Sequence, residues 1–60
     1  MEATFDQELD YAAGEAIFGL QLDKEQAVEF VLRNVKDFHV EPAQAERAID
    51  AILSDYKLSL

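Results

Sequence analysis

The sequence predicts an all-α protein, a small three-helix bundle with helices at approximately residues 5–19, 24–37 and 42–57. Three observations predict this class. Apolar residues recur every three or four positions in three segments, without the alternation of a strand. Residues that cap helices precede the first two segments, and a proline opens the third. A chain of 60 residues makes one domain, 1–60, and homodimerisation is an alternative way to complete so small a bundle.

The first helix is expected to begin after Thr4, because Thr4 and Gln7 have the spacing of a capping box. Its apolar face repeats at helical spacing through Phe5, Leu9, Ala12, Ala16 and Leu20. Gly19 is expected to end this helix, since glycine is the residue most often found just past a helix C-terminus.

The second helix is expected to begin after Asp23, which caps it with Gln26 three residues later. Its apolar face consists of Val28, Val31, Leu32 and Val35. Phe30 lies off this line and is interpreted as a core residue, because each helix of a three-helix bundle faces two others and has a wide apolar face.

The third helix is expected to begin at Pro42, whose fixed backbone angle suits a first helical turn and disfavours helix at Glu41. The segment 37–41 therefore separates the second and third helices. The apolar face of the third helix consists of Ala45, Ala48, Ile49, Ile52 and Tyr56.

The charge of the chain argues against several classes of partner. The formal net charge is −8 at pH 7, and the first 22 residues carry five acidic side chains and no basic one. Nucleic acids and anionic membrane surfaces are bound by clustered Lys and Arg, whereas the five basic residues here are dispersed among acids. We therefore expect no direct nucleic-acid or membrane binding, and a basic protein as the favoured partner.

The composition predicts a cytoplasmic protein. The chain contains no cysteine, so disulfides and thiolate metal sites are excluded. Proteins of reducing compartments commonly lack disulfides. The N-terminus is acidic and is not followed by the apolar run of a signal peptide. The longest uncharged stretch, residues 16–22, is too short to cross a bilayer.

No motif predicts catalysis, a cofactor or a metal. His39 alternates with Asp37 and Glu41, but no second cluster completes a coordination shell. The hydroxyl residues Thr4, Ser54 and Ser59 have no nearby histidine in the sequence to activate them. The chain is therefore expected not to be an enzyme.

The candidate partner-binding residues are Glu8, Asp10, Tyr11, Gly14, Glu15 and Phe18. At about 100° per residue, Tyr11 and Phe18 project from the side of the first helix opposite its apolar face. They are seven residues apart, which predicts a single ridge flanked by carboxylates. Gly14 leaves bare backbone between the rings, where a partner side chain could approach. The alternative interpretation places both rings in the bundle core.

These features predict a non-enzymatic regulator or inhibitor whose acidic first helix engages a basic surface on a partner protein. Carboxylates spaced along a helix can imitate the phosphates that a nucleic-acid-binding protein expects, so nucleic-acid mimicry and an antitoxin-like role are both included. The alternative is a structural homodimer, with Gly14 and small residues at 12, 13 and 16 allowing close helix contact. A helix-turn-helix DNA-binding protein is less favoured, because residues 41–46 offer no cation.

Overall fold

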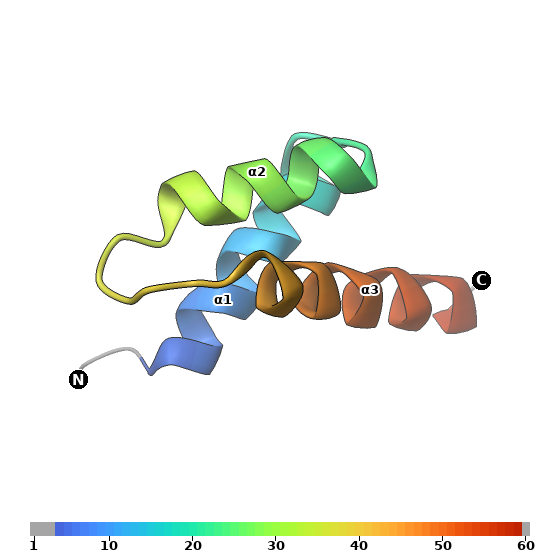
Figure 1. The fold of residues 1–60 in the computed structure, drawn as a ribbon. Helices are drawn as coiled ribbons and strands as arrows, with labels where there is room; N and C mark the ends of the chain where they lie inside the picture. The colour runs from blue at the N-terminus through green and yellow to red at the C-terminus, as the bar shows by residue number, and fades with distance from the viewer. Residues whose placement is uncertain (1–3, 60) are drawn as a thin grey trace.

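The computed structural model describes residues 4–59, with side-chain surroundings for residues 4–56. Within that range the chain forms α1 (Phe5–Gly14), the π-helical turn η1 (Glu15–Gly19), α2 (Lys24–Asn34) and α3 (Pro42–Ser59), and no strand. α2 and α3 lie side by side and run in opposite directions, while α1 crosses both (Figure 1). The helices pack against one another, so the predicted three-helix bundle is confirmed.

Short-range hydrogen bonds cap the first two helices. Thr4 Oγ1 accepts from the Gln7 amide at 3.1 Å, and Gln7 Oε1 accepts from the Thr4 amide at 3.0 Å, which confirms the capping box. Asp23 Oδ1 accepts from the Gln26 amide at 2.8 Å, which confirms the second cap. These contacts span only three residues, so each helix start is set locally.

α1 continues into a π-helical turn, which the sequence did not predict. The Leu20 amide donates to the Glu15 carbonyl, five residues back, at 2.9 Å. The helical segment ends at Gly19 as expected, but the left-handed residue that reverses the chain is Gln21, with φ of 55°. A side chain in this conformation costs about 1–2 kcal/mol, so the turn is held by packing rather than by local preference.

α2 ends at Asn34, three residues before the predicted boundary at 37. Asn34 Nδ2 donates to the Phe30 carbonyl at 2.8 Å and satisfies one of the last helical acceptors. Val35 then adopts an extended backbone, and its side chain is buried, as is that of Val40. The helix stops early because burying both valines holds the linker against the bundle.

α3 begins at Pro42 as predicted and extends to Ser59, two residues beyond the predicted boundary at 57. Gln44 Oε1 accepts from the Glu41 amide at 2.9 Å, a local contact at the start of α3 in addition to Pro42. In the described part of the chain, none of the helices combines the length and apolar character needed to cross a bilayer.

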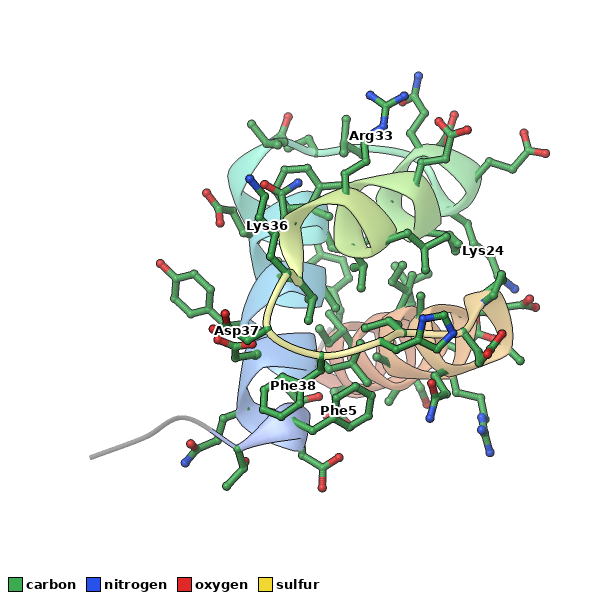
Figure 2. All side chains as sticks on the ribbon, turned by 60° about the vertical axis from the view of Figure 1, so that its left-hand side comes forward. Phe5, Lys24, Arg33, Lys36, Asp37 and Phe38 are labelled. Carbon is green, nitrogen blue, oxygen red and sulfur yellow. The ribbon has the colours of Figure 1, made fainter. Side chains whose placement is uncertain are left out.

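An exposed ion-pair cluster joins α2 to α3. Lys24 Nζ lies 3.0 Å from Asp50 Oδ1 and 3.3 Å from Glu46 Oε1, and its side chain points from α2 towards the first turns of α3 (Figure 2). Hydrogen bonds to Asp50 and Glu46 raise the pKa of Lys24 above its usual value. Exposed pairs of this kind contribute little to stability, so the packing of α2 on α3 depends mainly on their buried apolar side chains.

The core is built largely from small side chains. Its buried members are Leu9, Ala12, Ala13, Ala16, Ala27, Val31, Val35, Val40, Ala45, Ala48 and Ile49. Six of them are alanine, which lets the helices approach closely, and Phe30 packs against this cluster as expected. The rings of Phe5 and Phe38 meet edge to face, with centroids 5.5 Å apart, and cover one end of the core (Figure 2).

Two residues assigned to the apolar faces are exposed, and these assignments are wrong. Leu20 is 53% exposed, because the π-helical turn before it changes the direction in which the following side chains project from the helix axis. Tyr56 is 48% exposed, because the C-terminal turns of α3 extend beyond the other helices (Figure 1). The other residues of the predicted apolar faces lie in the core or pack against it.

Candidate functional site

A groove of about 450 Å³ runs between α1 and the C-terminal end of α2, and we call it the Tyr11 groove. It is lined by Gln7, Glu8, Tyr11, Ala12, Glu15, Asn34 and Val35. The ring of Tyr11 is 76% exposed, so it stands at the edge of the groove and is not part of the core. The early end of α2 at Asn34 helps to leave this space open.

Glu8 is the electrostatically unusual residue of the Tyr11 groove. Its Oε2 atom is buried and has no hydrogen-bond partner. Partial burial raises the pKa of Glu8 above its usual value, and the neighbouring carboxyl of Asp37 raises that pKa further through its charge and through a hydrogen bond. A carboxylate pair has no proton to share when both members are ionised, so the hydrogen bond forms only when Glu8 is protonated.

No cation of the described chain compensates this carboxyl pair. Asp37 lies in the linker beside α1, whereas Arg33 points outward from α2 and away from Asp37 (Figure 2). Among side chains 4–56, no Lys, Arg or His lies within ion-pair distance of Glu8 or Asp37. The pair therefore leaves negative charge at a partly desolvated position, where a positive group would be bound more strongly than in water.

Glu8→Gln is expected to stabilise the protein at neutral pH. Because the folded-state pKa of Glu8 is raised, folding disfavours the charged carboxylate, and stability falls as pH rises above 4.5 through the folded-state pKa. Glutamine cannot ionise and its amide can donate to Asp37. Urea midpoints should therefore be higher for the variant at neutral pH, and this advantage should shrink below pH 4.5.

Glu29→Gln is the control for this experiment, because Glu29 is exposed on α2 and its substitution makes the same change in net charge. It should leave the midpoint at neutral pH nearly unchanged. An equal gain from both substitutions would mean that overall charge repulsion, and not the Glu8–Asp37 contact, destabilises the folded state.

The structure brings together three of the six predicted site residues and separates the others. Glu8, Tyr11 and Glu15 line the Tyr11 groove. Asp10 lies on the α3 side of α1, in a groove that also contains Arg47. A Cβ atom added at Gly14 would meet nothing within 4 Å, so bare backbone is not required there.

Phe18 lies in another groove, against α3. Its ring centroid is 5.8 Å from that of Tyr56, with an interplanar angle of 51°. A π-helical turn has more residues per turn than an α-helix, so the seven-residue spacing no longer aligns Phe18 with Tyr11. The two rings, both exposed, therefore line separate grooves rather than a shared one.

Sequence reasoning missed Asp37 and Tyr56 as members of these surfaces. The sequence pattern groups Asp37 with His39 and places Tyr56 on the apolar face of the third helix. No local pattern links Asp37 to Glu8, because the two are separated by all of α2. Another acidic residue of the N-terminal segment, Glu2, lies outside the described residues.

The His39 segment does not assemble a set of metal ligands. His39 Nε2 lies 2.8 Å from Glu41 Oε1, and both side chains are exposed. Asp37 instead interacts with Glu8. Over the residues that the structure describes, no three His, Asp or Glu side chains gather into a potential metal site.

The fold and these surfaces define a class: a small acidic three-helix protein with an open, carboxylate-lined groove along its first helix. No protein-family model matches the chain, and comparisons with curated proteins and with solved structures also find no match.

Proposed function

We propose that this protein is a non-enzymatic regulator or inhibitor that binds a basic surface of a partner protein through α1. The observation that carries the proposal is the Glu8–Asp37 carboxyl pair, which lacks a compensating cation in the described chain and lies beside the exposed ring of Tyr11. An Arg or Lys side chain of the partner would neutralise the pair and pack on the tyrosine face.

The net charge of −8 supports the same class of partner, because it speeds the approach of a basic surface and repels acidic ones. Carboxylates on α1 imitate a row of phosphates, so the proposed partner is a protein whose basic surface binds nucleic acid. By occupying that surface the chain would block nucleic-acid binding, which is the antitoxin-like form of the proposal. The absence of cysteine supports action in the cytoplasm.

The alternative of a structural homodimer has less support from the packing. Ala12, Ala13 and Ala16, the small residues proposed to contact a second chain, are buried within the bundle. The helix-turn-helix alternative also has less support, because residues 41–46 at the start of α3 include no cation and the nearby Lys24 is engaged by Glu46 and Asp50.

The proposal is tested by affinity capture with three baits at low salt. The first bait is the wild-type chain, and the second carries Glu8→Gln, Tyr11→Ala and Glu15→Gln. The third is a charge-matched control with Glu25→Gln and Glu29→Gln, two exposed residues of α2. A basic protein should be retained by the wild type and the control, and binding to the Tyr11 groove variant should be at least about tenfold weaker.

Affinity for the captured protein should also fall as salt is added, because the contact is between charged surfaces. Equal retention by all three baits would show that the Tyr11 groove is not the binding site. Binding that is insensitive to salt would remove the electrostatic part of the proposal.

A further inference from the structure

A second groove lies between η1 and the C-terminal half of α3, and we call it the Phe18 groove. It is lined by Ile17, Phe18, Gln21, Leu22, Leu53 and Tyr56. None of these side chains is charged, whereas the Tyr11 groove and two further grooves, one lined in part by Lys24 and one by Arg47, contain carboxylates. In a chain with 30% charged residues, an uncharged groove indicates a contact for an apolar group.

The Phe18 groove is exposed because of two departures from regular packing. The π-helical turn directs Phe18 towards α3, and α3 extends past the other helices so that its last turns are open (Figure 1). Phe18 and Tyr56 remain 55% and 48% exposed although their ring centroids are only 5.8 Å apart, and Leu20, two residues after Phe18 in the chain, is 53% exposed. The C-terminal end of α3 and the linker between α2 and α3, which carries Phe38, lie at opposite ends of the bundle (Figure 1).

We infer that the Phe18 groove binds an apolar side chain on a basic amphipathic helix of the partner, an inference that rests on the proposed function. Phe18 on η1 and Tyr56 on α3 form the two sides of the groove. An amphipathic helix commonly binds such a groove by inserting one apolar anchor residue into it. Lysine or arginine on the flanks of that helix would meet the acidic residues that bracket segment 16–22, namely Glu15 and Asp23.

Glu15 connects the two grooves. It lines the Tyr11 groove, and its side-chain stem lies beside Gly19 in η1, where an added Cβ would be 3.4 Å from Glu15 Cγ. A single partner helix can therefore place a cation near Glu15 and Tyr11 and an apolar residue against the exposed sides of the Phe18 and Tyr56 rings. The π-helical turn sets the spacing between these contacts.

A second copy of the chain fits the Phe18 groove less well than a basic partner. Three half-exposed side chains offer roughly 300 Å² of apolar area, well below the roughly 800 Å² that each partner contributes to a stable interface. The rest of the interface must come from the surrounding charged surface. Two chains of net charge −8 repel each other there, whereas a basic partner is attracted.

The test uses two synthetic lysine-rich helical peptides that differ only on one face, which carries leucine in the first and alanine in the second. Affinities are measured by titration, and the contact residues by amide chemical shifts of the labelled full-length protein. The leucine peptide should bind at least about tenfold more tightly and should shift the amides of Phe18, Leu22 and Tyr56.

Phe18→Ser with Tyr56→Ser should remove this preference for leucine while leaving affinity for the alanine peptide unchanged. Both residues are exposed, so the fold should be kept, and circular dichroism verifies this. Leu20→Ser supplies a second variant, which should weaken the preference in part. Tyr11→Ser is the matched control, because it removes an exposed ring from the other groove and should leave the preference unchanged.

Equal affinity for both peptides, or a preference that survives the Phe18 and Tyr56 substitutions, would overturn the inference. A wild-type dimer that these substitutions convert to a monomer would also overturn it, since a second copy would then be the occupant. Failure of the proposed function gives a different result. In that case the Tyr11 groove variant would bind the alanine peptide as tightly as the wild-type protein does.

Discussion

Ile49→Ala is expected to lower the free energy of unfolding by about 2–5 kcal/mol, because it leaves a cavity where the bundle has few other large side chains. Ile49 is fully buried in the middle of α3 and belongs to a core cluster whose buried members are mainly alanine and valine. A domain of this size rarely has more than roughly 3–5 kcal/mol of net stability. The variant should therefore be largely unfolded, which urea titration followed by circular dichroism would measure.

Ile52→Ala is the matched control, since it makes the same change one turn later at a partly buried position. Its cost should be roughly half or less, in proportion to the smaller apolar area that it removes from the core. A similar loss from both substitutions would contradict the assignment of Ile49 to the centre of the core.

Ala13→Leu is expected to destabilise the protein by about 1–3 kcal/mol or more, because no space exists for the larger side chain. Ala13 is fully buried in α1, and Ala27 of α2 and Ala45 of α3 are also fully buried. Close approach of the three helices depends on these small side chains. Leucine at position 13 would force the helices apart, and urea titration should detect the loss.

Ala51→Leu serves as the control, because residue 51 is exposed on α3 and leucine is also a good helix former. Its effect should lie within about 0.5 kcal/mol of zero. If leucine at position 13 were tolerated equally well, the helices would be packed less tightly than the described core indicates.

The Tyr11 groove and the Phe18 groove both depend on places where the chain departs from ideal helix geometry. The early end of α2 leaves the Tyr11 groove open and allows Asp37 to reach Glu8. The π-helical turn moves Phe18 from the predicted ridge to the side of Tyr56. π-helical turns occur often at functional sites, which agrees with a role for η1 in positioning these side chains.

The candidate site could be predicted only in part. Glu8, Tyr11 and Glu15 follow from α-helical periodicity, because they precede or only just enter the π-helical turn. The periodicity also predicts that Phe18 faces outward, but it does not predict the neighbouring Tyr56, since that contact joins residues 38 positions apart. The Glu8–Asp37 contact likewise depends on how the linker packs.

The sequence by itself determined the number of helices, where each begins, and which residues form most of the core. Caps and apolar periodicity act within a few residues, so Thr4, Asp23 and Pro42 specify helix starts through local contacts alone. Only the tertiary structure decided where α2 stops, that α1 ends in a π-helical turn, and which groove each exposed ring lines. Those outcomes depend on the burial of Val35 and Val40 and on the strained backbone at Gln21. Both are stabilised by contacts between segments that are distant in the sequence, which local patterns do not encode.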